Sequence, residues 1–160
     1  MGGVTLYGGR RVNAAVPNNP GQAESHVVDP ATGEVQAVGL SDAHRVYAGW
    51  CHWGPLIAWI SVAASSGIAF IVPPLVALTL WQIKKAESPF IDDQGREALN
   101  FQISLILLGL ILIPVTLLTC GIGAILYIGI PILAIVGGII GGVRASKGIY
   151  FRYPMCFRLV

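Results

Sequence analysis

Two long stretches without charged side chains set the limits on what this chain can fold into. From Val46 to Ile83 the only residue that can carry a positive charge is His52, and from Ala98 to Val143 there is none. The chain has ten basic and eight acidic side chains in all. Seven of these charged side chains lie in the segment between the two stretches, Lys84–Glu97. Soluble domains are roughly 25% charged, whereas this chain is 11% charged and 54% hydrophobic. The pattern therefore predicts an integral membrane protein.

The first apolar block is too long for one membrane helix. Its 38 residues would form a helix of ~57 Å, nearly twice the ~30 Å hydrocarbon core of a bilayer. We expect it to fold back at Ser65-Ser66-Gly67, which leaves spans at about 46–64 and 68–83. Pro73-Pro74 interrupts the second span, because proline removes a backbone donor. This arm is predicted to be either a thin, kinked span or a re-entrant segment covered by protein.

The second block, 98–143, is also long enough for two spans. Thr119–Gly123 supplies the turn, so the spans are predicted at about 98–118 and 122–143, with kinks at Pro114 and Pro131. The predicted turns carry no charge, whereas basic residues flank the opposite helix ends. Short positively charged loops stay in the cytoplasm, so both termini are expected there. The predicted fold is all-α, an integral membrane four-helix bundle of two helical hairpins.

The domain organisation follows from this pattern. Residues 1–40 are rich in Gly, Pro and Asn and are predicted to be a flexible polar tail with at most a small turn or hairpin at Asp29–Val35. The membrane domain is predicted to run over 41–147, with Ser41 capping its first helix. Residues 148–160 form an amphipathic C-terminal tail.

The central charged segment is the first candidate functional or structural site. Ser88 and Pro89 predict a helix start, and Asp92 falls in the first turn, where the helix dipole favours acids. Asn100 and Gln102 enter the apolar zone just beyond it. They either hydrogen-bond to Lys84, Lys85 or the tail, or act on a substrate or proton. The candidate residues here are Lys84, Lys85, Ser88, Pro89, Asp92, Asp93, Arg96, Glu97, Asn100 and Gln102.

Two further candidates lie towards the C-terminus. Gly137/Gly141 and Gly138/Gly142 are small-xxx-small pairs, which serve either packing inside one bundle or dimerisation. The tail residues Arg152, Tyr153 and Pro154 belong to a segment that alternates aromatic residues with arginines. The tail either lies in the lipid headgroup layer or folds back onto the central segment, with Arg152 pairing to Asp92, Asp93 or Glu97.

The residues point to no catalytic, cofactor or metal site, so the protein is expected not to be an enzyme. No Ser/His/Asp set with plausible reach, histidine pair at helical spacing or phosphate-binding glycine loop is present. Cys51, Cys120 and Cys156 have no paired spacing. The net charge of +2 is too small and too dispersed for nucleic-acid binding.

The stretch Trp81–Ile103, with Lys84-Lys85, Ser88-Pro89-Phe90 and Glu97-Ala98-Leu99-Asn100-Phe101-Gln102, resembles the signature of a prokaryotic membrane family. The ending Tyr150–Pro154 is similar to that family's terminal motif. The family is a domain of unknown function (DUF forty-eight seventy) grouped with Tic twenty-like proteins, whose plastid relatives take part in protein import.

The resemblance implies a multi-pass protein of a bacterial plasma membrane that acts as a scaffold or a protein-translocation accessory. The alternative is a small transporter or channel lined by Asn100, Gln102 and the broken second arm. The expected partners are the lipid bilayer and either other membrane proteins or further copies of the chain.

Overall fold

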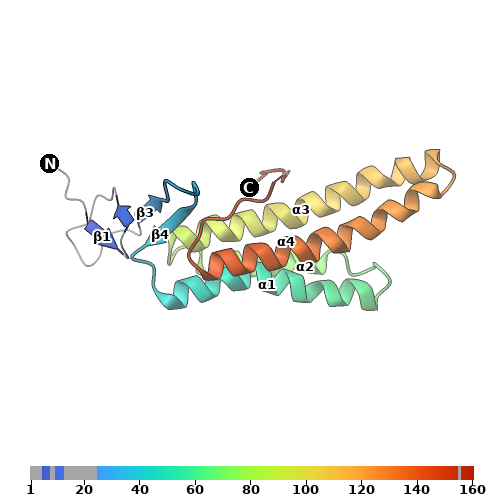
Figure 1. Ribbon diagram of the computed structural model, residues 1–160. Coiled ribbons are helices and arrows are strands. Elements are labelled where there is room, and N and C mark those ends of the chain that lie inside the picture. The colour runs from blue at the N-terminus through green and yellow to red at the C-terminus, as the bar shows by residue number, and fades with distance from the viewer. Residues whose placement is uncertain (1–4, 8–9, 13–24, 155) are drawn as a thin grey trace.

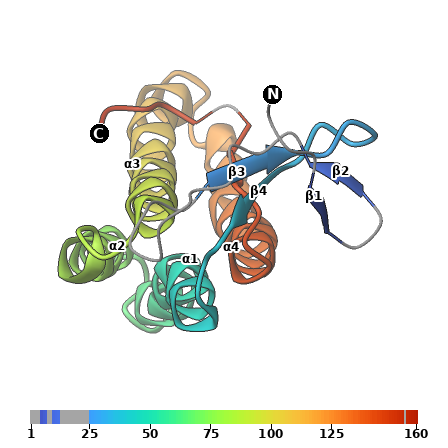
Figure 2. The same ribbon diagram turned by 90° about the vertical axis from the view of Figure 1, so that its left-hand side faces the viewer.

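The computed structural model describes residues 5–7, 10–12, 25–154 and 156–160, and over these residues the chain is mainly helical. Its α-helices pair as two antiparallel hairpins that lie side by side (Figure 1, Figure 2). A 3₁₀ helix, η1, leads directly into the last α-helix. The bounds are α1 Asp42–Ala64, α2 Val72–Lys84, α3 Pro89–Leu118, η1 Ile122–Ile128 and α4 Gly129–Ser146. The prediction of four helices in two hairpins is confirmed.

Local chemistry fixes where the helices begin. The Ser41 hydroxyl accepts a hydrogen bond from the His44 amide at 3.2 Å, and the Ser88 hydroxyl accepts one from the Ile91 amide at 3.3 Å. These bonds satisfy amides that have no partner inside the helix. Pro89 occupies the first position of α3, where its missing N–H costs nothing. The predicted helix starts at Ser41 and Ser88 are both confirmed.

The turn after α1 differs from the prediction, and proline is the reason. Ser66 and Gly67 adopt left-handed backbone angles, with φ of 54° and 93°, and α2 does not begin until Val72. Pro73 and Pro74 therefore stand in its first turn instead of interrupting it. A proline kink, which one of the two alternatives for this arm required, is therefore absent from α2, and the re-entrant alternative stays a prediction. At 13 residues α2 is only ~20 Å long, and the α3–α4 hairpin extends beyond the α1–α2 turn (Figure 1).

The two prolines of the α3–α4 hairpin differ in their position along the helices. Pro131 lies in the first turn of α4, next to the junction with η1, whereas Pro114 lies inside α3. The turn between α3 and η1 uses Cys120 and Gly121, with φ of 50° and 95°. It lies within the uncharged stretch 119–123 that was predicted to turn.

Two helical stretches among the described residues are long and apolar enough to cross a membrane, Pro89–Leu118 and Ile122–Ser146. The most apolar windows of these stretches are only 17% and 22% buried. A core helix of a soluble protein would bury most of such a window. The long helices therefore present their apolar side chains to the surroundings.

The described part of the N-terminal region forms two short antiparallel strand pairs. These pair β1 (Thr5–Tyr7) with β2 (Arg10–Val12), and β3 (Ser25–Val28) with β4 (Val35–Val38). The hairpin that was considered around Asp29–Val35 is thus present. Much of the predicted flexible tail lies outside the described residues, and its flexibility stays a prediction.

The β3–β4 hairpin packs against the end of the helical bundle where the charged segments lie (Figure 2). The Ala37 amide donates to the Gly148 carbonyl and the Tyr150 amide to the Val35 carbonyl, each at 2.8 Å. The start of the C-terminal tail thereby pairs with β4. A small apolar core joins the two parts, built from Ala37, Leu40, Ala48, Phe90, Ile91 and Ala145.

Candidate functional site

The first half of α3 presents a stripe of polar side chains, Asp93, Glu97, Asn100 and Ser104. Their spacing of four, three and four residues places them on one face of the helix. The described residues of the C-terminal segment, 149–154 and 156–160, run back beside α3 (Figure 1) and form hydrogen bonds with all four of them. We call these four residues and the segment that they hold the tail clasp.

Glu97 is the centre of the tail clasp. Its side chain is only 1% exposed, yet its carboxylate accepts hydrogen bonds from Arg152 Nη1 at 3.2 Å and from Arg158 Nη2 at 3.3 Å. Arg158 Nε donates a further bond at 3.4 Å, and the backbone amide of Tyr153 donates one at 2.8 Å. A buried carboxylate needs such partners, because desolvation otherwise costs several kcal/mol. No local pattern in the sequence marks Glu97 as buried.

Arg152 also forms an ion pair with Asp93, so the predicted pairing of this arginine with the central acids is confirmed. Desolvation alone would lower the pKa of Arg152, but the charges of Asp93 and Glu97 outweigh it and raise that pKa. The guanidinium is therefore held in its charged form. The fold-back of the tail, one of the two alternatives for this segment, is the arrangement that the structure has.

Asn100 and Ser104 bind the backbone of the tail. Asn100 Oδ1 accepts from the amides of Leu159 and Val160 at 3.0 and 3.1 Å, and its Nδ2 donates to the Val160 carbonyl at 3.1 Å. The Ser104 hydroxyl accepts from the Phe157 amide at 2.9 Å. The side-chain hydrogen bonds of Asn100 thus go to the tail, as one of its predicted alternatives required.

Gln102 and the two lysines have other partners. Gln102 Oε1 accepts from Trp59 Nε1 at 3.1 Å, across to α1. Lys84 pairs with Glu87 at 2.8 Å, and the Lys85 ammonium lies 5.2 Å from the centre of the Trp81 ring. The structure therefore does not bring the lysines to Asn100 or Gln102, and that predicted alternative was wrong.

The other candidate residues of the central segment act locally. Asp92 accepts from Trp81 Nε1 at 2.7 Å and from Arg96 Nε at 3.3 Å, which joins α2 to the start of α3. Pro154 is exposed in the tail, directly after the buried Tyr153. No binding role is evident for Pro154 from its position.

A buried hydrogen-bonded chain runs from the tail clasp into α1. Tyr153 Oη lies 2.9 Å from His52 Nδ1, and His52 Nε2 lies 3.3 Å from Gln94 Oε1. The Gln94 amide nitrogen donates to Asp93 and to the Phe151 carbonyl, so its oxygen faces His52. A neutral His52 that donates from Nε2 to Gln94 has Nδ1 as an acceptor for Tyr153 Oη, whose hydroxyl proton is shared with the Gly137 carbonyl at 3.2 Å. Burial, followed by the charge of Glu97, raises the pKa of Tyr153, which keeps the phenol neutral.

The four candidate glycines of α4 make room for neighbouring side chains. A Cβ at Gly141 would lie 2.8 Å from His52 Nδ1 and still closer to Tyr153 Oη. At Gly137 it would meet the Phe101 ring at 2.5 Å. Gly138 and Gly142 similarly contact Leu56 and Trp53 of α1. Both small-xxx-small pairs are thus filled within one chain, which favours the internal-packing interpretation over dimerisation.

His52, Gln94, Ser104 and Arg158 are the site residues that the sequence analysis missed. Ser104 could have been found, because it extends the polar spacing from Asp93, Glu97 and Asn100 along one helical face. His52 and Gln94 carry no such signal, since their contact joins different helices. Among the described residues, no group of three or more His, Cys, Asp or Glu side chains is arranged to hold a metal ion. The contacts of the site hold the tail against α3.

These features define a class of protein: a small, apolar, helical bundle with two membrane-capable helices and its charged groups gathered at one end. The chain belongs to the MamF/MmsF family, the magnetosome magnetite crystal formation protein family, whose sequence profile matches residues 43–160. The match covers the helical bundle and the tail clasp. No curated protein and no solved structure was found to match the chain.

The family match corrects the resemblance drawn from Trp81–Ile103. The chain is not a member of the DUF forty-eight seventy or Tic twenty-like family, and the protein-import role implied by that resemblance is withdrawn. Much of the motif meets general physical demands: Ser88 caps a helix, Pro89 occupies its first position and Asp92 complements its dipole. Residues of this kind recur at helix starts in unrelated proteins and therefore identify a family poorly.

Proposed function

We propose that this protein is a multi-pass component of the magnetosome membrane that takes part in magnetite crystal formation as a structural scaffold, without catalysis. Family membership supports the compartment and the process. The apolar, largely exposed surfaces of Pro89–Leu118 and Ile122–Ser146 support insertion in a bilayer. The magnetosome membrane replaces the plasma membrane that the sequence analysis predicted.

The distribution of charge is the observation that supports the scaffold role most directly. Charged side chains gather where α2 meets α3 and where α4 meets the tail, whereas the turns 65–71 and 119–128 contain none. Because positively charged loops stay in the cytoplasm, we place both termini there. The two uncharged turns then face the side on which the crystal grows. Since α2 is only ~20 Å long, the α1–α2 hairpin inserts less deeply than the α3–α4 hairpin.

This orientation leaves little that could bind iron on the crystal side. Turns 65–71 and 119–128 contain no carboxylate and no imidazole, and their only strong metal-ligating side chain is the thiol of Cys120. A protein that shaped the crystal by direct contact would need such ligands. We therefore assign it an action exerted from within the membrane, through helix packing and partner contacts.

The transporter alternative has less support. The Asn100 side chain is bound by the tail on both its oxygen and its nitrogen, and the Gln102 oxygen is bound by Trp59, so these side chains offer few polar groups to a passing solute. The space next to Gln102 is lined mainly by aliphatic and aromatic residues. A polar solute would have to give up its hydration there without compensation.

Reporter fusions test the orientation. Reporters fused after Gly67 and Gly121 should be located outside the cytoplasm, and reporters fused after Glu87 and Val160 should be located inside it. An inside signal at Gly67 would show that the α1–α2 hairpin does not cross. A cytoplasmic signal at Gly121 would place the α3–η1 turn on the same side as the termini and reject the proposed topology.

Complementation in a magnetite-forming bacterium that lacks this gene tests the scaffold role. The wild-type chain and Cys120→Ser should restore crystal size equally in electron micrographs, because the thiol has no role in a scaffold. Glu97→Ala, which releases the tail, should restore it incompletely. Small or misshapen crystals with Cys120→Ser alone would favour direct contact with the mineral.

A further inference from the structure

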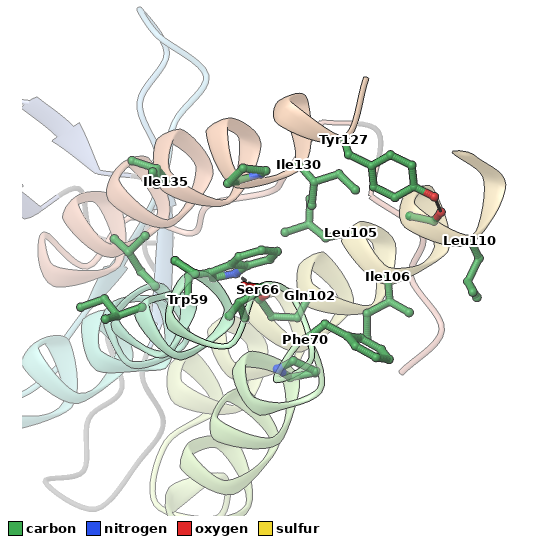
Figure 3. Close-up of a pocket in the computed structure, with 18 of the residues that line it drawn as sticks. Trp59, Ser66, Phe70, Gln102, Leu105, Ile106, Leu110, Tyr127, Ile130 and Ile135 are labelled. Carbon is green, nitrogen blue, oxygen red and sulfur yellow. Dashed lines mark hydrogen bonds between the residues drawn. The ribbon is translucent and has the colours of Figure 1, made fainter. Parts of the chain in front are cut away.

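A cavity of about 1000 Å³ lies between the two helical hairpins (Figure 3). One side is formed by α1 and the α1–α2 turn, with Trp59 and Phe70. The other is formed by α3, η1 and α4, with Leu105, Ile106 and Ile130. None of the twenty residues that line it is charged. The cavity is therefore apolar and lies between the central segment and the uncharged turns.

Its few polar groups are mostly paired with each other or with the backbone. Trp59 Nε1 donates to Gln102 Oε1 at 3.1 Å, and the Tyr127 hydroxyl donates to the Gly109 carbonyl at 2.9 Å. A buried water needs two to four polar partners. Because these groups are paired, few donors or acceptors remain in the cavity for a water to bind. A cavity of this size without an occupant would forfeit the dispersion contacts of its whole lining. Its chemistry suits a hydrocarbon.

We propose that this cavity binds an acyl chain of a bilayer phospholipid. The proposal rests on the membrane insertion proposed above, which places the opening between the hairpins in contact with the hydrocarbon layer. The short α2 helix explains why the space exists, because the α1–α2 hairpin ends before it can cover the distal part of α3 and α4 (Figure 1). The bilayer supplies the filling material at very high local concentration.

A helix from a second copy fits the cavity poorly. A helix with its side chains is about 10 Å wide, and close approach in membranes depends on small residues at the contact. The lining is dominated by Leu, Ile, Trp and Phe. The small-residue pairs of α4 are already filled by Tyr153, Phe101, Leu56 and Trp53. An extended acyl chain, which is narrow and flexible, avoids both problems.

Photolabelling in proteoliposomes tests the proposal. The probe is phosphatidylethanolamine with a mid-chain diazirine, in vesicles of phosphatidylethanolamine and phosphatidylglycerol. We expect label on the cavity residues Trp59 and Ile106 as well as on the outward-facing Ile111. Gly109→Leu should displace the chain, because a Cβ there meets only Ile130, at 3.6 Å, and the side chain can enter the cavity.

The expected loss is about tenfold in cavity label relative to Ile111 label, since losing the contact of two methylenes already changes affinity by about that factor. Gly129→Leu is the matched control: a Cβ there has no neighbour within 4 Å, and the residue does not line the cavity. It should leave the ratio unchanged. Ile106→Trp, read at Trp59, provides a second variant that fills the space if Gly109→Leu does not fold.

The outcomes separate this proposal from the proposed function. Label on Ile111 without label on Trp59 or Ile106 would overturn the lipid site and leave membrane insertion in place. Absence of label from all three residues would reject insertion itself. Cavity label that persists in both filled variants would show that the probe reaches these residues without occupying the cavity, and it would overturn the proposal.

Discussion

Replacing Glu97 tests whether the tail clasp is held by one buried carboxylate. In the wild-type chain this group is 1% exposed and accepts from Arg152, Arg158 and the Tyr153 amide. Glu97→Ala removes the hydrogen bonds from all three of these residues. Glu97→Gln keeps an oxygen for the Tyr153 amide but removes the negative charge, so the two variants separate the hydrogen bond from the ion pairs.

The two contributions differ in size. An amide left buried without an acceptor costs ~1–3 kcal/mol. The side chains of Arg152 and Arg158 are 51% and 53% exposed, so solvent screens each ion pair to ~0–1 kcal/mol. Glu97→Ala should therefore lower the free energy of unfolding by ~2–4 kcal/mol in total. Glu97→Gln should lower it by ~1 kcal/mol. At ~3 °C per kcal/mol for a chain of this size, Glu97→Ala lowers the Tm by ~6–12 °C.

The reactivity of Cys156 reports release of the tail directly. In the wild-type chain Ser104 lies 3.5 Å from its sulfur, and burial is the main cause that raises the pKa of this thiol. Cys51 is fully buried and Cys120 is exposed, so a Cys120→Ser background leaves Cys156 as the main target for a maleimide. Glu97→Ala should accelerate labelling in detergent. An unchanged labelling rate together with a Tm within about 1 °C of wild type would refute the reasoning.

Three further results are expected. Arg152→Glu should lower the Tm, and adding Asp93→Lys should restore part of the loss; losses that simply add in this double-mutant cycle would show the two sites to be independent. Gly141→Ala should destabilise by ~1–3 kcal/mol because its Cβ collides with Tyr153 and His52, whereas Gly129→Ala, which has open space, should change stability by less than ~0.5 kcal/mol in a thermal melt. The pKa of Tyr153 is raised above its ordinary value of 10.0, so this tyrosine ionises first in the unfolded chain, and the stability of the fold should decrease as the pH rises past that value. Tyr153→Phe should make this decrease in stability with pH less steep. An unchanged slope would exclude Tyr153 as its source.

Local chemistry explains how much of the fold could be predicted from the sequence. The starts at Ser41 and Ser88 and the turn around Gly121 follow from caps, charge and glycine within a few residues. The start of α2 was misplaced because hydropathy alone put it at 68, where Pro73 and Pro74 would fall in mid-helix. Proline is tolerated in the first turn, so the chain begins the helix at Val72 and lengthens the preceding turn instead.

The site was predictable only where charge or spacing carried a signal. The pairing of Arg152 with Asp93 followed from clusters of opposite sign on one side of the bundle. The contact of His52 with Tyr153 joins residues 101 positions apart, and no local pattern reports it. The stacking of Tyr153 on Phe101, with ring centres 3.9 Å apart, is equally invisible in the sequence.

The tail folds onto α3, instead of lying in the headgroup layer, for a reason that starts with Glu97. Alternating arginines and aromatic rings suit either location. A carboxylate this deeply buried requires positive partners, and nearby cations are already used: Arg96 pairs with Asp92, Lys84 with Glu87 and Arg144 with Glu34. Arg152 and Arg158 meet the requirement, and the segment between them must then follow α3. The buried acid on the helix thus dictates the path of the tail.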